Sequence, residues 1–226
     1  MNRGRTKLLF AALGKCMMGF IALSLLLFPA AGTIYYRGAW LLMGALFIPM
    51  IVLGCIMLVK SPELLQRRLD AKEERGSQQG VIRFSGLIFI IGFVVAGLDY
   101  RLGWSHMSHA VVHTATLFFL IGYALYAEVL RENVWLSRTV KVESEQSVIS
   151  TGLYGIVRHP MYIATLIMFV AMPLVLGSWW SLAIIAFYIP LIVIRILDEE
   201  KLLHKELNGY DEYCQKVRWR LLPFVW

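Results

Sequence analysis

Charged residues are scarce in this chain of 226 residues. Only 16% are Asp, Glu, Lys or Arg, whereas 58% are hydrophobic and the mean hydropathy is +0.65. A soluble domain carries about a quarter charged residues, so the composition argues against one. The apolar residues lie in long runs, without the alternating segments of about ten residues that are typical of a membrane β-barrel. We therefore expect an all-α protein that crosses a membrane several times.

Cysteine is almost absent, and this limits redox and metal chemistry. The three cysteines are far apart in the chain, and no pair has the spacing of a metal or redox motif, so we predict neither a disulfide nor a metal site. They are Cys16, Cys55 and Cys214. A cluster of three histidines keeps a metal site open as an alternative, but the sequence places no carboxylate beside them. They are His106, His109 and His113.

The excess of basic over acidic residues does not indicate nucleic-acid binding in this chain. The net charge is +7, but there is no Cys/His finger spacing, and the aromatic residues fall inside apolar runs. Basic residues collect on the cytoplasmic side of membrane proteins. All of the 22 Lys and Arg residues except Arg37 and Arg101 fall on one side of the apolar segments. We predict no nucleic-acid partner, and a multi-pass protein of the plasma membrane with both termini cytoplasmic.

Six hydrophobic segments account for the predicted spans, each of which needs about 20 apolar residues. The first follows Arg3, Arg5 and Lys7 and imitates a signal peptide, but we favour a retained helix. The third is short, and we expect it to extend to residues 80–82 or to be matched by local thinning of the bilayer. The segments are residues 8–31, 39–59, 84–98, 110–130, 161–176 and 179–197.

Two regions follow from this division. Residues 1–131 form N-terminal transmembrane helices. Residues 132–226 contain a long cytoplasmic connection, a tight helical hairpin joined near Gly177 and Ser178, and a polar amphipathic helix over residues 198–217. Because loops of that length usually carry function, we expect any chemistry in this second region.

The first polar motif is GLYGIVRHPMY at residues 152–162, where the long connection enters the fifth segment. Pro160 suits the first turn of a helix. Free backbone N–H groups near His159 could then bind a carboxylate. The structural alternative is that Arg158 anchors the chain at the membrane interface and His159 caps the helix.

The second polar motif, RILDEEKLL at residues 195–203, ends the sixth segment. Arg195 and Glu199 are four residues apart and share a helix face. If exposed, they form an ion pair worth a few tenths of a kcal/mol. Several charges at a membrane boundary are otherwise costly, unless they face a protein or water-filled cavity. Both readings stay open on physical grounds.

The third motif, GYDEYCQKVRWRLLP at residues 209–223, carries two tyrosines three residues apart. Leu203, Leu207 and Tyr210 form one apolar stripe, which is typical of an amphipathic helix on the bundle or on the membrane surface.

In this order and spacing, the three motifs resemble the isoprenylcysteine carboxyl methyltransferase family and the related phospholipid N-methyltransferases. The family pattern is G-x-Y, R-H-P-x-Y entering a helix, a short helical hairpin, an Arg followed by E-E-x-x-L, and Y-x-x-Y before a terminal Pro. The resemblance covers about residues 133–226. The matching residues are Gly152, Tyr154, Arg158, His159, Pro160, Met161, Tyr162, Arg195, Glu199, Glu200, Leu203, Tyr210, Tyr213 and Pro223.

The resemblance implies a cytoplasmic-side site for S-adenosylmethionine. It implies catalytic roles for Arg195 and Glu199, with Arg195 meeting the substrate's carboxylate or head group. Ile196 stands where relatives often carry Thr, which bears on the substrate and not on the cofactor. The implied cofactor-binding residues are Glu143, Gln146, Ser147, Val148, Ile149, Tyr154, His159, Pro160, Met161, Tyr162, Glu199 and Glu200.

The sequence thus predicts a membrane methyltransferase for a lipophilic acceptor, either the carboxyl of an isoprenylcysteine-like compound or a lipid head group. One alternative is an NADPH-dependent membrane reductase of the sterol-reductase type, although no basic cluster for a 2′-phosphate is evident. The other is a non-enzymatic membrane protein. A transporter would more often show polar or broken helices at the bilayer midplane, which residues 39–59 and 84–98 lack.

Overall fold

The computed structural model describes residues 3–70, 76–137, 139, 142 and 145–226, and the regular structure in these ranges is helical. The α-helices are separated by short turns, and a single 3₁₀ turn interrupts the long connection after α5. The elements are α1 (Arg3–Ala31), α2 (Arg37–Lys60), α3 (Pro62–Leu69), α4 (Gly76–Leu102), α5 (His109–Glu132), the 3₁₀ turn η1 (Gly152–Gly155), α6 (Pro160–Val175), α7 (Trp179–Ile185), α8 (Tyr188–Glu206) and α9 (Tyr210–Lys216).

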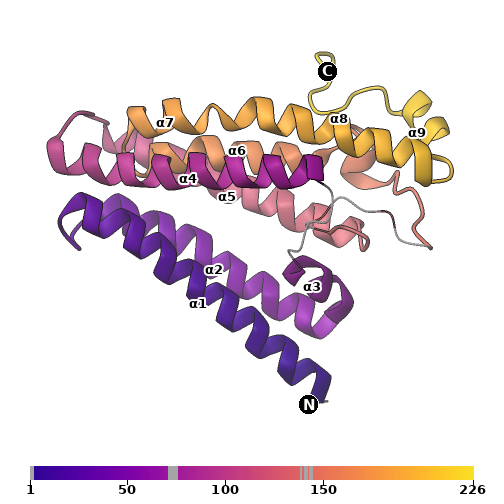
Figure 1. Cartoon of the computed structure of the whole chain (residues 1–226), viewed down its shortest axis with the longest axis horizontal. Helices are drawn as coiled ribbons and strands as arrows, with labels where there is room; N and C mark the ends of the chain where they lie inside the picture. Colours follow the sequence, from indigo (N-terminus) through magenta and orange to yellow (C-terminus); the bar gives the residue numbers. More distant parts are fainter. Residues whose placement is uncertain (1–2, 71–75, 138, 140–141, 143–144) are drawn as a thin grey trace.

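The helices form a bundle and a leaning hairpin. Helices α4 to α8 run side by side, with α5 packed most extensively on α6 and α4 packed on both α7 and α8 (Figure 1). Helices α1 and α2 form an antiparallel pair that contacts α4 and α5 at one end and leans away towards the N-terminus. The short α3 lies in the angle between the hairpin and the bundle.

The multi-pass all-α prediction is confirmed. Within the described residues, five helices are long and apolar enough to cross a membrane: Gly4–Ala31, Arg37–Lys60, Gln78–Leu102, His109–Glu132 and Trp179–Glu206. The remaining predicted segment, residues 161–176, forms α6, which has 16 residues and falls short of the usual 20 or so. The third segment is extended, as expected, because α4 already begins at Gly76.

The hairpin between α6 and α7 turns where it was predicted. Ser178 lies at the N-cap of α7, and its hydroxyl accepts a hydrogen bond from the Ser181 amide at 3.0 Å. The predicted helix over residues 179–197 is interrupted between Ile185 and Tyr188, however. Pro190 has no N–H to donate to the Ala186 carbonyl, and its ring crowds that carbonyl, which explains the break.

The prediction of one amphipathic helix over residues 198–217 is wrong in its continuity. Helix α8 ends at Glu206, and α9 begins at Tyr210. Between them Gly209 adopts φ +82°, a left-handed conformation that glycine tolerates without strain. This turn folds α9 back, so that Leu207 and Tyr210 pack with Val148 of the long connection.

Close helix contacts hold the bundle together at glycines. A Cβ on Gly122 of α5 would lie 2.8 Å from Met168 Cγ of α6, and a Cβ on Gly97 of α4 would lie 2.8 Å from the Leu27 carbonyl oxygen of α1. Small residues are the usual means of close approach between membrane helices. The largest core cluster contains side chains from α1, α2, α4, α5 and α6, so both predicted regions share one core.

A buried carboxylate closes the end of the bundle opposite α9. Asp99 is 1% exposed and accepts hydrogen bonds from the Ser105 amide and hydroxyl, both at 2.7 Å, and from the Ser178 hydroxyl at 2.5 Å. We call Asp99, Ser105 and Ser178 the Asp99 cluster. It ties the end of α4 to the turn before α7.

Helix α3 is fastened to the connection that follows α5. Arg67 Nη1 donates to the Val134 carbonyl at 2.7 Å, and Arg68 Nη1 donates to the Ser137 carbonyl at 2.9 Å. Arg68 also contacts the Tyr126 hydroxyl of α5. These contacts hold α3 against α5 and the start of the connection.

Candidate functional site

The start of α6 is held by the C-terminal segment. Pro160 occupies the first turn of the helix, as predicted. The amide of Arg158 donates to the Trp219 carbonyl and the amide of His159 donates to the Arg220 carbonyl, each at 2.9 Å. The prediction that free N–H groups at His159 bind a carboxylate is therefore wrong for these two amides, because the chain itself uses them.

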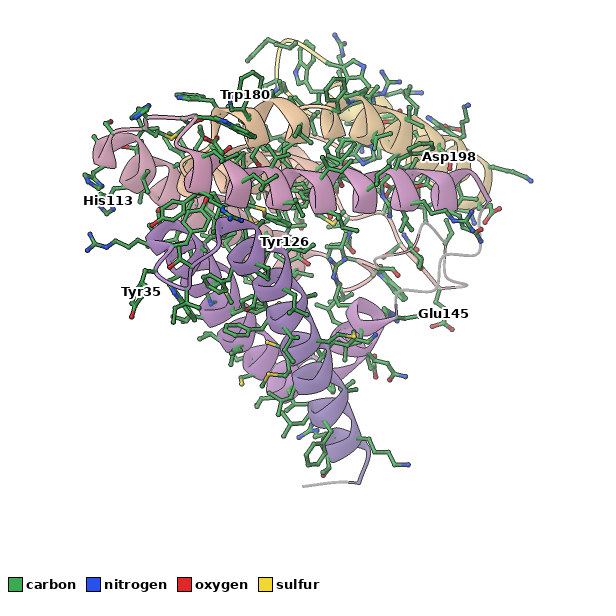
Figure 2. All side chains as sticks on the ribbon, turned by 60° about the vertical axis from the view of Figure 1, so that its left-hand side comes forward. Tyr35, His113, Tyr126, Glu145, Trp180 and Asp198 are labelled. Atoms are coloured by element: carbon green, nitrogen blue, oxygen red, sulfur yellow. The ribbon has the colours of Figure 1, made fainter. Side chains whose placement is uncertain are left out.

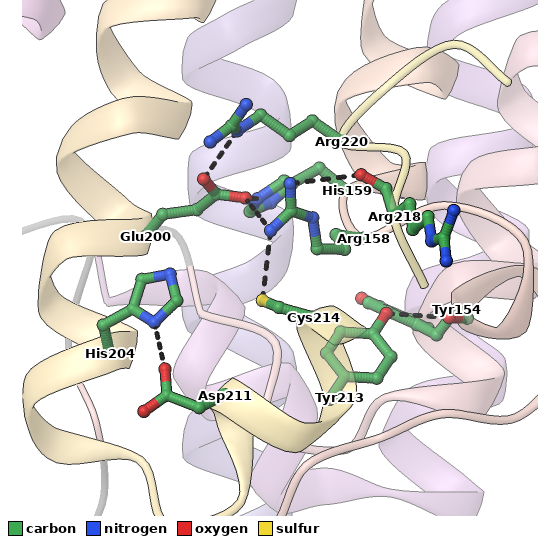
Figure 3. A network of polar contacts seen from close by, with 10 residues as sticks. All are labelled: Tyr154, Arg158, His159, Glu200, His204, Asp211, Tyr213, Cys214, Arg218 and Arg220. Carbon is green, nitrogen blue, oxygen red and sulfur yellow. Dashed lines mark hydrogen bonds and ion pairs between the residues drawn. The ribbon is translucent and has the colours of Figure 1, made fainter. Parts of the chain in front are cut away.

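A second buried carboxylate, Glu200 of α8, gathers three basic side chains (Figure 3). Its Oε1 lies 3.3 Å from His159 Nε2 and 3.2 Å from Arg158 Nη1, and its Oε2 accepts from Arg220 Nε at 2.7 Å. Glu200 is only 3% exposed. We call these four residues the Glu200 cluster. His159 occupies the N-cap position of α6, as the alternative expected, but its side chain binds Glu200 and makes no cap hydrogen bond.

Arg158 remains charged in this setting. Burial alone would lower its pKa, but hydrogen bonding to Cys214 and the negative charge of Glu200 raise the pKa above its usual value. The Arg158 Nη1 atom lies 3.0 Å from Cys214 Sγ, and Nη2 donates to the Arg218 carbonyl at 3.4 Å. The guanidinium thus lies inside the protein and not at an open membrane interface.

Arg195 of α8 lies in a second network. Its Nε donates to the Tyr162 hydroxyl at 3.0 Å, and that hydroxyl donates to Glu199 Oε2 at 2.6 Å. Its Nη1 donates to Oε1 of Gln78, a fully buried residue of α4, at 3.1 Å. Gln78 Nε2 in turn donates to Asp198 at 2.5 Å. The Arg195 guanidinium is therefore held by hydrogen bonds to both Tyr162 and Gln78.

A cavity lies between these two networks and the long connection. It encloses about 80 Å³ of free space within a wider hollow of about 580 Å³ that is open to solvent. The enclosed part is smaller than a typical small-molecule site of about 300–1,000 Å³. The lining residues come from the connection, η1, the start of α6, α8 and α9: Asn133, Leu136, Gln146, Ser147, Val148, Ile149, Tyr154, Arg158, His159, Met161, Tyr162, Glu199, Leu203, Leu207, Tyr210 and Tyr213.

Most of the predicted cofactor-binding residues line this one cavity. They are Gln146, Ser147, Val148, Ile149, Tyr154, His159, Met161, Tyr162 and Glu199. Glu200, Pro160 and Arg195 do not line the cavity. Arg195 is hydrogen-bonded to Tyr162, which does line it. Glu143 lies outside the described residues. Segments far apart in the sequence are thus brought together as the resemblance implies.

Tyr154 forms part of the cavity wall in neutral form. Its hydroxyl accepts from Asn133 Nδ2 at 3.0 Å, and its backbone carbonyl accepts from the Tyr213 hydroxyl at 2.7 Å. Burial raises the pKa of Tyr154 to about 12, although the hydrogen bond from Asn133 opposes this. At neutral pH the ring therefore offers an uncharged aromatic surface to the cavity.

Several lining residues were not predicted to bind a ligand. Arg158, Leu203, Tyr210 and Tyr213 belong to the three motifs, so their positions in the motifs could have indicated them. The other unpredicted lining residues are Asn133, Leu136 and Leu207. No sequence pattern indicated that Gln78 contacts Arg195, because the two residues are 117 positions apart in the chain.

Two buried donors on the cavity wall lack a partner. Among the described residues, neither the Tyr210 hydroxyl nor Arg158 Nε has a hydrogen-bond partner, and both atoms are inaccessible to solvent. A buried polar group without a partner costs about 1–3 kcal/mol. Buried polar groups without a partner are rare in native proteins.

The histidines considered for metal binding are remote from this cavity. His106, His109 and His113 are exposed. Figure 2 shows His113 at the end of the bundle opposite Asp198 and Glu145. In the part of the chain that the structure describes, no group of His, Cys, Asp and Glu residues is arranged to hold a metal ion.

The chain is similar to known methyltransferases in sequence and in fold. Residues 110–208 match the family model of phospholipid methyltransferases. The whole chain superimposes on the eukaryotic intramembrane Ras methyltransferase ICMT, the isoprenylcysteine carboxyl methyltransferase, with a TM-score of 0.53. The likeness covers 100% of this chain and 99% of that one at 14% sequence identity, so it establishes the fold alone.

A curated relative has a different activity. Over 91 residues, 39% of this chain, the sequence is 31% identical to the Delta(14)-sterol reductase of Mus musculus. The match spans only 22% of the reductase. The resemblance predicted from the three motifs is confirmed by the family model and by the fold, and the chain is an integral membrane protein.

Proposed function

We propose that the chain is an S-adenosylmethionine-dependent membrane methyltransferase that acts on a lipophilic acceptor. The observation that carries the proposal is the cavity. It joins the RHP segment, Glu199 and the long connection within the stretch that matches phospholipid methyltransferases.

The cavity lining fits this cofactor. The carboxylate of Glu199 favours a cationic group such as a sulfonium or an ammonium. Leu136, Val148 and Ile149, with the neutral ring of Tyr154, form an apolar wall suited to adenine. A ligand with a positive centre and an aromatic base meets both conditions.

Catalysis in this proposal depends on positioning. S-adenosylmethionine supplies a methyl group that passes to the acceptor in one in-line displacement, so the protein needs no covalent intermediate. Holding two reactants in line is itself a large contribution to the rate. Arg195 can bind an anionic acceptor, and its orientation is fixed by Tyr162 and Gln78.

The acceptor in this proposal enters from the bilayer. Arg195 lies on α8, within the span-capable stretch Trp179–Glu206, and α6 and α4 pack beside it. The carboxyl of an isoprenylcysteine-like compound and the phosphate of a lipid head group both suit a guanidinium. The basic residues at this end favour a cytoplasmic location for the site, and the proposal puts it in the plasma membrane.

A reductase is the second candidate, because a stretch of 91 residues is similar to the sterol reductase. It would need cations for the 2′-phosphate of NADPH. The basic residues on the cavity wall are Arg158 and His159, and both contact Glu200. The site therefore favours the methyltransferase.

Calorimetry on the detergent-purified full chain tests the proposal. We expect saturable binding of S-adenosylmethionine to wild type, at least tenfold weaker binding to Glu199→Ala, and weak or no binding to His159→Ala. Lys201→Ala is the matched control, because this residue of the same helix is exposed and does not line the cavity. Absence of binding by folded wild type, together with binding of NADPH, would replace the methyltransferase by the reductase.

A further inference from the structure

The C-terminal loop, residues 219–226, lies against the part of α8 that is apolar enough to cross a membrane. Leu221 is buried and packs with Ile192 and Ile196 of α8, and Figure 1 shows the C-terminal segment beside this helix on the outer side of the bundle. The charged end of α8 begins at Asp198, about 9 Å further along the helix than Ile192 at 1.5 Å per residue. The loop therefore lies at the depth where the apolar part of the helix ends.

The C-terminal loop exposes large apolar side chains at this depth. Leu222 is 49% exposed, Val225 74% and Phe224 86%. The Phe224 ring lies 5.5 Å from the Trp219 ring between centroids. Phe224 also has φ +65°, a left-handed conformation in which glycine and asparagine are common and bulky side chains are rare. A phenyl ring that is held outwards in this conformation indicates a contact outside the protein.

The backbone of the C-terminal loop is suited to apolar surroundings. The amides of Leu221 and Leu222 donate to the Trp226 backbone oxygen at 2.9 and 3.2 Å. The amides of Val225 and Trp226 donate to the Leu222 carbonyl, each at 3.1 Å. Pro223 has no N–H that needs a partner. Backbone polar groups in lipid must find their partners within the protein, and these four amides find them inside the loop itself.

The charge around the loop has one sign. Residues 214–226 contain Lys216, Arg218 and Arg220 and no Asp or Glu. The side chains of Lys216 and Arg218 are exposed. Basic side chains beside an exposed apolar surface are typical of segments that lie on an anionic membrane. The occupant that fits both features is therefore the surface of a bilayer that contains anionic phospholipids.

We propose that the C-terminal loop inserts its three exposed apolar side chains into the bilayer interface and binds anionic phospholipids through Lys216 and Arg218. The inference goes beyond the proposed function and does not depend on it. The carbonyls of two loop residues accept from the two amides that precede α6. The lipid surface therefore contacts the same segment that holds the start of α6 in place.

Spin labels on the full chain in lipid nanodiscs test the insertion. Cys16, Cys55 and Cys214 are replaced by Ser, and a nitroxide is attached at Val225→Cys. The matched control carries it at Asn208→Cys, an exposed position in the turn between α8 and α9. An apolar face at the interface is buried about 5–10 Å deep, so we expect collisions with a polar nickel reagent to be about fivefold rarer at residue 225 than at residue 208. Equal collision rates at the two positions would overturn the insertion.

A second experiment tests the lipid charge and keeps the native cysteines. The unfolding temperature of the full chain is measured in micelles mixed with phosphatidylglycerol or with phosphatidylcholine. A ligand that binds the folded state raises this temperature, so we expect a higher value with phosphatidylglycerol. The double variant Lys216→Gln/Arg218→Gln should lose about half of this difference or more. Lys201→Gln/Lys205→Gln is the matched control, because it removes two exposed charges from the same end of α8.

The outcomes of the second experiment are equally clear. A difference between the two lipids that the control pair retains and the loop variant loses supports binding of anionic phospholipids at the C-terminal loop. No difference in wild type, or the same loss in both double variants, would overturn that assignment.

Discussion

The Asp99 cluster and the Glu200 cluster lie at opposite ends of the same helical bundle, and each buries a carboxylate almost completely. The oxygens of Asp99 accept from neutral hydroxyl and amide donors in two turns, the one after α4 and the one before α7. Glu200 binds basic side chains from two segments, Arg158 and His159 before α6 and Arg220 near the C-terminus, and Arg158 Nε stays unpaired beside it. A satisfied cluster fastens the fold, whereas an incomplete one beside a cavity indicates a ligand.

Glu200→Ala should produce the largest effect. It leaves two guanidiniums without a carboxylate inside the protein, and breaking a buried ion pair costs about 3–5 kcal/mol. We expect a strong fall in the free energy of unfolding, measured by thermal unfolding in detergent, together with loss of S-adenosylmethionine binding. Glu200→Gln keeps the shape and should show a smaller loss. An alanine variant with wild-type affinity would remove the positioning role of Glu200.

Asp99→Ala should affect stability alone. It leaves the Ser105 and Ser178 donors without their acceptor, which costs about 1–3 kcal/mol. We expect a lower unfolding temperature and a dissociation constant for S-adenosylmethionine within about twofold of wild type. A large loss of cofactor affinity would contradict the contrast between the two ends of the bundle.

Gln78→Leu tests whether the N-terminal region contributes to the site. It frees Arg195 Nη1 while the Tyr162 contact remains. We expect kcat/KM for the acceptor to fall about tenfold, which corresponds to about 1.4 kcal/mol, with unchanged cofactor affinity. The assay follows methyl transfer to phosphatidylethanolamine and to a farnesylated cysteine. Gln78→Glu keeps an oxygen acceptor and should restore part of the rate; equal loss in both variants would contradict the positioning role.

Arg68→Ala should give the smallest effect. Arg68 fastens α3 to the connection that carries Asn133 and Leu136 into the cavity wall. We expect faster amide hydrogen exchange at residues 134–137 and a cofactor affinity about twofold to threefold lower. Lys60→Ala, an exposed substitution near α3, is the control. Unchanged exchange would show that this contact does not order the connection.

Local patterns predicted much of this protein. Long apolar runs indicated the membrane helices, and Pro160 indicated the start of α6, because each signal depends only on neighbouring residues. The breaks at Pro190 and Gly209 were missed, because the surrounding apolar pattern continues through them. The N–H groups of Arg158 and His159 were expected to be free, since no sequence pattern reveals their pairing with Trp219 and Arg220.

The sequence by itself determined that this chain is a helical membrane protein, because hydrophobic length and helix signals are local properties. It also determined the family resemblance, since the RHP and EE motifs lie close in sequence to the helix ends that present them. Only the tertiary structure decided which donors are satisfied and which are free. Satisfaction depends on partners far away in the chain, as the Gln78–Arg195 contact and the unpaired Tyr210 hydroxyl show.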